Sequence, residues 1–205
     1  MTIIDLTHPF TADMPVYPGD PVPAFMSIAS IPNDGYADEE LTSGLHVGTH
    51  IDAPAHMLKG GKLLSDYPAE RFVGRGVLID ARGKSLFSVN LLRDIELKAG
   101  DIVLILTGWS AKYNEPAYFE GHPQFTEDFA EKLIESQVSM VGMDTAGPDK
   151  EPYLIHQQLL GSDVLIAENL NHLEQLANVA GFEVIALPTM LVNSAAPARV
   201  IAKVN

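Results

Sequence analysis

The sequence predicts a single α/β domain over residues 1–205, built around a mixed sheet. Three observations favour this class. A length of 205 residues fits one domain. Apolar runs rich in Val or Ile alternate with helix-like runs in the second half of the chain. Hydrophobic residues make up 46% and charged residues 20%, which is ordinary for a globular protein that buries a large core.

Short apolar segments flanked by Gly, Pro or Asp are predicted to be the strands. They are Thr2–Leu6, Ala24–Ser30, Gly76–Ala81, Asp101–Thr107, Ser139–Asp144, Asp163–Ala167, Phe182–Leu187 and Ala198–Val204. Helices are predicted over Ser88–Leu97, Thr126–Ser136, Glu151–Leu160 and Asn171–Asn178. The second of these has the clearest pattern, because Thr126 can cap it and its apolar residues recur at helical spacing. The chain up to about residue 75 is rich in turn signals, and long loops in a compact domain usually carry function.

Charge and composition exclude several classes of function. The formal net charge is −14, which argues against binding a nucleic-acid backbone or an anionic membrane surface. The chain has no cysteine, so disulfides, thiolate nucleophiles and Fe–S clusters are excluded. No signal peptide or run long enough to span a membrane is visible, and a cytoplasmic location is therefore expected.

Three of the seven histidines fall between residues 46 and 56. His46, His50, Asp52 and His56 all occupy even positions, and the odd positions between them are apolar or nearly so. This period of two predicts an extended chain that directs His46, His50 and Asp52 to one face and buries the other face. Residues two apart on a strand are close enough for their side chains to converge on one or two metal ions.

Two other interpretations of this cluster compete with metal binding on a strand. A helix would put His46 and His50 one turn apart, as in zinc proteases, but Gly48 and Pro54 disfavour a helix here. The cluster could also consist of structural histidines, although strict alternation with a carboxylate favours metal binding or catalysis. Imidazole and carboxylate ligands suit Zn²⁺, Mn²⁺ or Fe²⁺.

More ligands are expected from elsewhere, because a catalytic zinc ion usually has three protein ligands and dinuclear sites have more. His156 lies in a predicted helix. Glu168 follows an apolar run, at the C-terminal end of a predicted strand. Ligands in open α/β sheets bind at that end of the strands, so both residues are candidates.

These motifs together resemble those of the cyclase-like metal-dependent hydrolases, a family that includes bacterial kynurenine formamidase and isatin hydrolase. The specific signature is His46-x-Gly48-Thr49-His50-x-Asp52-x-Pro54-x-His56. Weaker matches follow in order over nearly the whole chain: Asp5-Leu6-Thr7-His8, Tyr17-Pro18-Gly19-Asp20, Thr107-Gly108, Asp144-Thr145, His156-x-x-Leu159-Leu160, Glu168-Asn169-Leu170 and Pro197-Ala198-Arg199-Val200.

The resemblance implies a swivelling β/α/β layout, a homo-oligomer (often a dimer) and a site for one or two divalent ions, Zn or Mn. Carried over by position, His46, His50 and Asp52 match the ligands of one ion. Asp52, His156 and Glu168 match the ligands of a second ion in the zinc-dependent formamidases. His56 matches the general acid/base.

Two positions depart from the formamidase pattern. Tyr17 stands where the formamidases carry a tryptophan that packs on the substrate, so Tyr17 is expected to bind substrate. Gly147 stands where many members have a serine. Both departures weaken the expectation that the substrate is N-formylkynurenine, and neither affects the predicted metal ligands.

The predicted function is hydrolysis of an amide, formamide or cyclic amide of a small organic substrate. A metal-activated water would attack the carbonyl, with His56 taking and returning a proton. The chain has no Gly-x-Ser-x-Gly elbow and no cysteine, so water is the expected nucleophile. Two alternatives remain open from the residues: a non-haem iron oxygenase with two histidines and one carboxylate, and a non-catalytic metal-binding protein.

Overall fold

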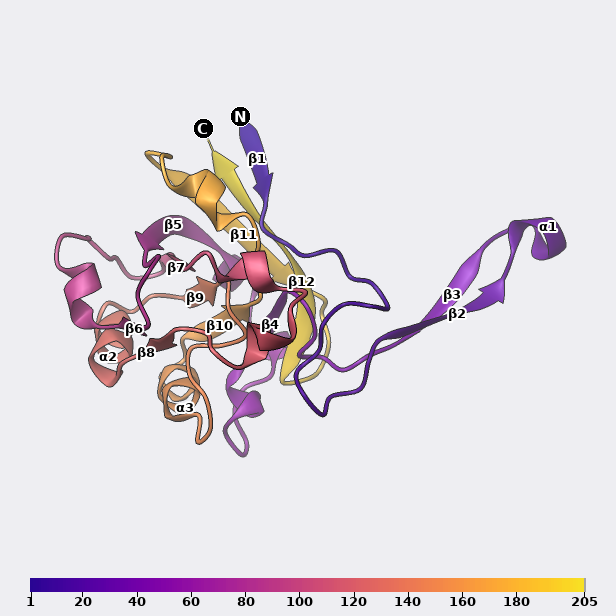
Figure 1. Cartoon of the computed structure of the whole chain (residues 1–205), viewed down its shortest axis with the longest axis horizontal. Coiled ribbons are helices and arrows are strands. Elements are labelled where there is room, and N and C mark those ends of the chain that lie inside the picture. The colour runs from indigo at the N-terminus through magenta and orange to yellow at the C-terminus, as the bar shows by residue number, and fades with distance from the viewer. Residues whose placement is uncertain (205) are drawn as a thin grey trace.

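Eight strands form one mixed sheet that closes on itself (Figure 1). The computed structural model describes residues 1–204. The strands of this sheet are β1 Thr2–Asp5, β4 His50–Asp52, β5 Val73–Asp80, β7 Ile102–Leu106, β9 Met140–Met143, β10 Leu165–Glu168, β11 Phe182–Pro188 and β12 Ala195–Val204. Their order is β1-β12-β11-β5-β7-β9-β10-β4, and β4 also pairs with β12, which closes the ring. The predicted α/β class with a mixed sheet is confirmed.

The central strand β7 is buried on both faces. Its side chains alternate between two apolar cores: Ile102, Leu104 and Leu106 point into the closed sheet, and Val103 and Ile105 point toward the helices. A strand that is covered on both faces reads as a continuous apolar run, which is how it was recognised in the sequence. β5 and β9 run parallel to β7 on either side of it.

Two helices cover the outer face of the sheet, α2 Glu127–Glu135 and α3 Leu154–Gly161 (Figure 1). α2 buries Phe129 and Leu133 against the sheet, as their spacing predicts. Thr126 stands at the N-cap position of α2, but its hydroxyl donates to the carbonyl of Phe87 instead of capping the helix. The expected side-chain cap is therefore wrong, and the hydroxyl ties α2 to the short pair formed by β6 Leu86–Phe87 and β8 Gln124–Phe125.

The helices predicted over Ser88–Leu97 and Asn171–Asn178 are wrong. Each segment forms a single 3₁₀ turn, over Val89–Leu92 and Leu173–Leu176. In the second segment the Asn171 side chain accepts a hydrogen bond from the backbone N–H of His172, and such a local bond competes with helix formation. The other 3₁₀ turns are Pro54–His56, Leu64–Asp66, Ala69–Phe72, Trp109–Lys112 and Pro116–Phe119.

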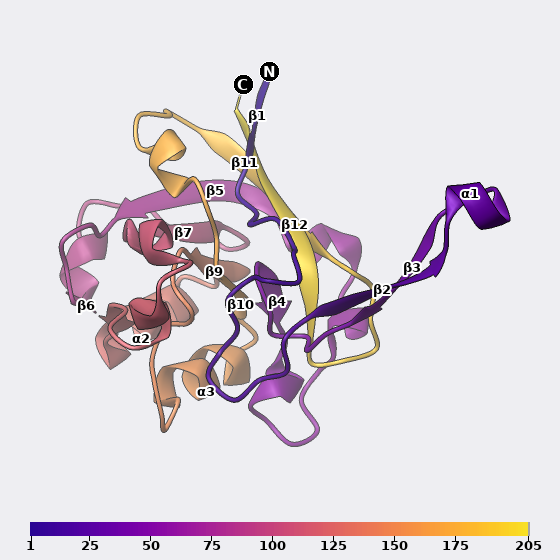
Figure 2. The same cartoon turned by 45° about the vertical axis from the view of Figure 1, so that its right-hand side comes forward.

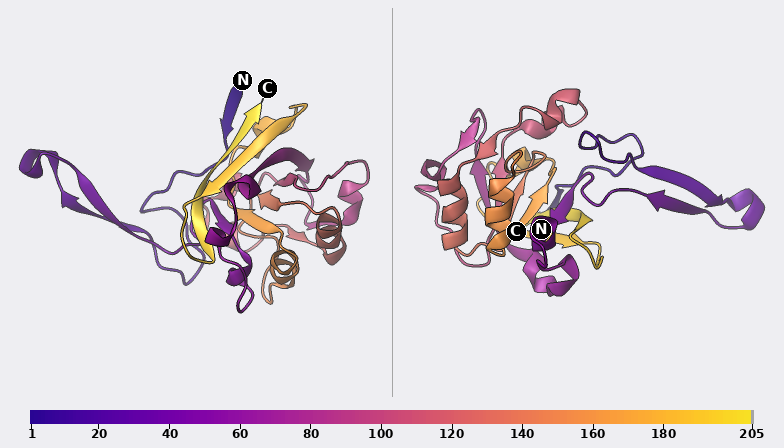
Figure 3. Two further views of the ribbon diagram at one scale, coloured as in Figure 1. Left: turned by 180° about the vertical axis from the view of Figure 1, so that it is seen from behind. Right: turned by 90° about the horizontal axis from the view of Figure 1, so that it is seen from below.

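A long hairpin projects from the body of the molecule (Figures 2 and 3). This arm consists of β2 Ala24–Ala29, the short helix α1 Ile31–Asp34 and β3 Asp38–Thr42. Within it only Ala29 is buried. The two chain ends lie side by side, where β1 pairs with β12. Among residues 1–204, no helix is long and apolar enough to cross a membrane.

Candidate metal centre

The strand β4 carries the centre of the predicted histidine motif. It is only three residues long and lies between β10 and β12, antiparallel to both. Ile51 points into the apolar core and is fully buried, so the strand alternation turns His50 and Asp52 to the opposite face. The register pairs His50 with Glu168, which brings the two sequence stretches together across one strand pair.

The extended conformation does not reach His46. The chain bends over residues 45–49, and Gly48 adopts a left-handed φ of 64°. The predicted strand is therefore too long, because Gly48 permits a turn that residues with a side chain rarely make. The bend folds His46 back over the strand, and its Nδ1 lies 2.8 Å from Oδ1 of Asp52.

The carbonyl of Gly48 holds this bend to the end of β10. It accepts hydrogen bonds from Nδ1 of His50 at 2.7 Å and from Nδ2 of Asn169 at 3.0 Å. The Tyr118 hydroxyl donates in turn to Oδ1 of Asn169 at 2.8 Å. With its Nδ1 engaged, His50 directs Nε2 toward Asp52 at 3.4 Å and Glu168 at 3.5 Å.

The structure brings five predicted residues into two groups that share Asp52. One atom from each of His46, His50 and Asp52 lies within 4.8 Å of the others, and the same holds for Asp52, His156 and Glu168. Nε2 of His156 lies 3.0 Å from Oε1 of Glu168. His156 comes from α3 and Glu168 from the C-terminal end of β10, the placements that the sequence indicates.

The donor atoms of these groups fit a divalent cation. Among the described residues, Nε2 of His50 and both carboxylate oxygens of Asp52 are buried without a hydrogen bond of ordinary geometry. Buried polar atoms are nearly always partnered in proteins, so such a set indicates a missing ligand. Imidazole nitrogens and carboxylate oxygens are ligands that Zn²⁺ and Mn²⁺ accept.

Burial and charge act in opposition here. Burial favours a raised pKa for Asp52, but the neighbouring His50 and His46 outweigh it and lower the pKa, so Asp52 stays ionised. Burial also favours a low pKa for His156, yet hydrogen bonds to Asp149 and Glu168 raise it to about 10. Without a cation, the site therefore balances its carboxylates with protonated imidazole.

His56 belongs to neither group. It ends the 3₁₀ turn Pro54–His56, and its ring centroid lies 3.9 Å from that of His46 and 6.1 Å from that of His156. Burial lowers the pKa of His56, although the charge of Asp52 opposes this, and the imidazole is neutral at pH 7. It stands beside the predicted ligands and can exchange a proton with a molecule bound next to them.

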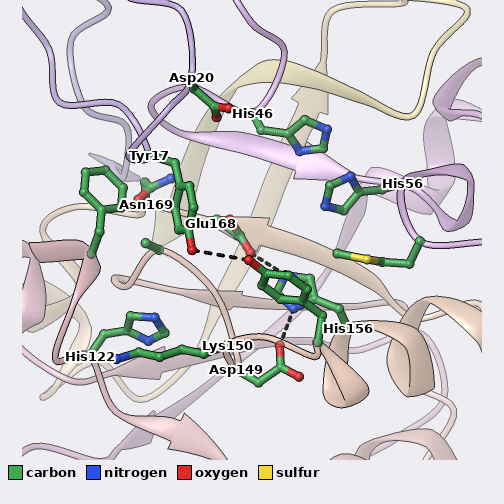
Figure 4. Close-up of a pocket in the computed structure, with 14 residues that line it drawn as sticks. Tyr17, Asp20, His46, His56, His122, Asp149, Lys150, His156, Glu168 and Asn169 are labelled. Atoms are coloured by element: carbon green, nitrogen blue, oxygen red, sulfur yellow. Dashed lines mark hydrogen bonds and ion pairs between the residues drawn. The ribbon is translucent and has the colours of Figure 1, made fainter.

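A pocket of about 280 Å³ opens over both groups (Figure 4). Five of the predicted residues line it: Tyr17, His46, His56, His156 and Glu168. His50 and Asp52 do not line it and are each only 1% exposed.

Aromatic side chains form the rim of this pocket. Tyr17 is 42% exposed there, and its hydroxyl lies 3.3 Å from that of Tyr153. The ring of Phe119 meets Tyr17 edge to face.

The sequence left several pocket residues unassigned. His122 is 5% exposed and lines the pocket. Asp149, Lys150 and Asn169 also line the pocket. No periodicity marks these residues because they lie in loops. The available signals were the position of Asn169 directly after Glu168 in a family motif and the spacing of Asp149 seven residues before His156.

Gly147 has a steric reason to lack a side chain. Its φ is 145°, and a Cβ built on it would lie 3.0 Å from Oε1 of Glu168 and 3.1 Å from Cε1 of His156. The loop therefore passes directly against two predicted ligands. The departure from serine at this position is a feature of the metal centre as well as of the pocket.

This closed α/β sheet and its imidazole–carboxylate centre are those of a metal-dependent hydrolase. Comparison with known proteins specifies the family. The Cyclase family profile matches residues 4–150, and the chain belongs to this family.

Relatives of known activity cover almost the whole chain. A kynurenine formamidase of Bacillus mycoides is 29% identical over 93% of this chain and 91% of its own length. The solved structure of isatin hydrolase A from Labrenzia aggregata, bound to benzyl benzoate, superposes with a TM-score of 0.87 at 26% identity, covering 99% and 93% of the two chains. A structure described as a potential metal-dependent hydrolase with cyclase activity gives 0.83 at 30% identity, covering 100% and 98%.

These similarities confirm the family resemblance and the assignment as a hydrolase of non-peptide C–N bonds. They favour the hydrolase over an iron oxygenase or a non-catalytic metal-binding protein.

Proposed function

We propose that the protein hydrolyses the C–N bond of a small organic amide, formamide or cyclic amide. The observation that carries the proposal is the pair of candidate ligand groups beside the pocket, which share the buried Asp52 while His56 belongs to neither. The named activities of the kynurenine formamidase and isatin hydrolase relatives support this bond type.

In this proposal His46, His50 and Asp52 hold one divalent ion, and Asp52, His156 and Glu168 hold a second. When bound, such an ion would supply Lewis-acid chemistry, polarising a carbonyl group and lowering the pKa of water to near neutrality. Asp52 and Glu168 supply the negative charge that keeps a cation in a buried site.

His56 is the proposed general acid/base. Its neutral imidazole takes a proton from the attacking water and returns it to the leaving nitrogen. Tyr17 is the proposed substrate-binding residue, since its ring borders the pocket beside Phe119 and Tyr153. These rings favour a planar substrate.

We further propose Zn²⁺ or Mn²⁺ as the ion, in one or two copies, and a homo-oligomer, most simply a dimer, as the working form. The ligand types support both metals equally. The exposed apolar arm supports the oligomer. The domain boundary at 1–205 and the cytoplasmic location stay predictions.

The test is hydrolysis of a substrate panel by metal-free protein reloaded with Zn²⁺ or Mn²⁺. The panel contains formanilides, isatin and lactams, and each reaction is run in air and without oxygen. We expect metal-dependent turnover of at least one substrate class at equal rates under both atmospheres. Oxygen consumption with Fe²⁺, or binding of metal without turnover of any amide, would contradict the proposal.

A further inference from the structure

A carboxylate that is not among the predicted ligands accepts a hydrogen bond from the imidazole of His156. Asp149 lies in the loop between β9 and α3 and is 8% exposed. Its Oδ2 accepts the backbone N–H of Ile155 at 2.6 Å, and its Oδ1 accepts a hydrogen bond from Nδ1 of His156 (Figure 4). Both oxygens of one buried carboxylate are thus used on the first turn of α3.

The second bond decides which nitrogen His156 presents to the site. With Nδ1–H donated to Asp149, the free position is Nε2, which points at Glu168 from 3.0 Å and belongs to the second ligand group. A carboxylate that accepts the other ring N–H fixes the orientation and tautomer of a metal-bound histidine and makes it a stronger ligand. We propose that Asp149 is a positioning residue that holds His156 ready for a divalent cation.

The loop that contains Gly147 places the Asp149 carboxylate beside His156. Gly147 passes close to the imidazole edge, because a Cβ built on it would lie 3.1 Å from Cε1 of His156, tighter than ordinary van der Waals contact. The chain then reaches Asp149 two residues later, on the Nδ1 side of the same ring. The close approach and the hydrogen bond act on one imidazole from adjoining directions.

If Asp149 served only to begin α3, one acceptor oxygen would be enough. An asparagine can provide that oxygen for the N–H of Ile155. Asparagine cannot also accept from Nδ1 of His156, because its second atom is an NH₂ donor. That donor favours the tautomer with the proton on Nε2, which blocks the metal lone pair. Asp149→Asn therefore separates positioning from helix capping.

The experiment is titration of Zn²⁺ into metal-free protein against a chromophoric chelator, which reports stoichiometry and affinity without any substrate. The inference rests on the proposed function for the existence of the ions. In Asp149→Asn we expect the ion bound through His156 to lose 10- to 100-fold in affinity, the usual effect of such partners. The ion at His46 and His50 keeps its affinity. Glu151→Gln, an exposed charge-matched change in the same loop, behaves as wild type.

A second measurement, made on wild type, tests the inference even if Asp149→Asn folds poorly. In Zn²⁺-loaded wild type, ¹⁵N–¹H correlation spectra are expected to show a proton on Nδ1 of His156, assigned by its loss in His156→Gln. Unchanged Zn²⁺ affinity in folded Asp149→Asn, or an unprotonated Nδ1 in wild type, overturns the inference.

Two further outcomes separate the inference from the proposed function. Wild type that binds no Zn²⁺ overturns both. Absence of amide hydrolysis with the expected Zn²⁺ results overturns the proposed function alone.

Discussion

Different single residues of the centre are proposed to bind the metal and to transfer the proton. His56 lies outside both ligand groups, whereas Asp52 belongs to both. We expect His56→Ala to keep its bound metal and to lose roughly 10²- to 10⁴-fold in turnover, the range for general acid–base catalysis. Asp52→Ala should lose metal and activity together. Elemental analysis of the purified variants beside their turnover rates checks this pair.

Each half of that prediction can fail separately. Metal loss from His56→Ala would make His56 a ligand. A fully active and fully loaded Asp52→Ala would remove Asp52 from the proposed site.

A buried histidine outside the site gives the fold a pH dependence. His8 stacks on Tyr113 with ring centroids 3.7 Å apart, and its Nε2 has no partner among the described residues. Burial, with a smaller contribution from His172, lowers its pKa from 6.5 to about 4. Between these pH values the unfolded chain binds a proton that the folded protein excludes, so the free energy of unfolding falls as pH decreases.

Urea unfolding of metal-free protein between pH 7.5 and 4.5 measures this effect. Below pH 6.5 the free energy of unfolding of wild type should fall more steeply with decreasing pH than that of His8→Phe. The difference in slope should correspond to the uptake of less than one proton on unfolding. The histidines that do not interact with His8 contribute equally to both proteins and cancel in the difference, and a His172→Gln background removes the one that does. Parallel curves would show that His8 takes no part.

At the scale of elements, the strands were predictable and the turns between them were not. β7 was predictable as a strand from the apolar run Ile102–Leu106 because both of its faces are buried, and β9 and β10 are buried in the same way. The helix predicted over Asn171–Asn178 was wrong because the hydrogen bond from the backbone of His172 to the Asn171 side chain competes with helix formation and leaves no periodic pattern. In the arm, β2 was predicted as a strand but β3 was not, and the projection of the arm from the body depends on the whole fold.

The candidate site followed the same division. Alternation identified His50 and Asp52 as sharing a face, since that face is a property of a strand. The position of His46 depends on the bend at Gly48, and Asp149 and His122 enter the pocket from loops. Bringing residues 46–56 next to Glu168 required the pairing of β4 with β10, which the family motifs implied and local patterns could not.

The bend before β4 makes its own prediction. Gly48→Ala places a side chain at a left-handed φ of 64° and brings a Cβ within 2.4 Å of the flexible end of Met14. We expect a loss of roughly 1–2 kcal/mol in the free energy of unfolding from the backbone strain. Zn²⁺ affinity should also fall, because the bend positions His46 and orients His50.

Gly83→Ala is the matched control for this change. Gly83 has a φ of 74° with open space around its Cβ position, and it lies in a turn after β5. It should cost similar stability and leave Zn²⁺ affinity unchanged. Equal affinities in both variants would show that the bend does not support the centre.

At the scale of the whole molecule, the arm is unstable as an isolated feature. A two-stranded hairpin is marginal in water, and this one exposes Phe25, Met26 and Ile28 by 47% to 59% on β2 alone. Covering such side chains contributes about 1.5–3 kcal/mol each, so a second copy of the chain would stabilise the arm. The net charge of −14 opposes self-association, and salt should therefore strengthen it by screening.

Light scattering during gel filtration tests this arrangement, with wild type expected to elute as an oligomer. Ile28→Asp should shift the protein toward monomer, because it buries a charge in the proposed contact. Leu86→Asp changes a side chain of equal exposure, 60% against 59%, far from the arm in the chain, and should leave the oligomer intact. A monomeric wild type at every salt concentration would refute the oligomer. An oligomer that survives Ile28→Asp would place the interface away from the arm.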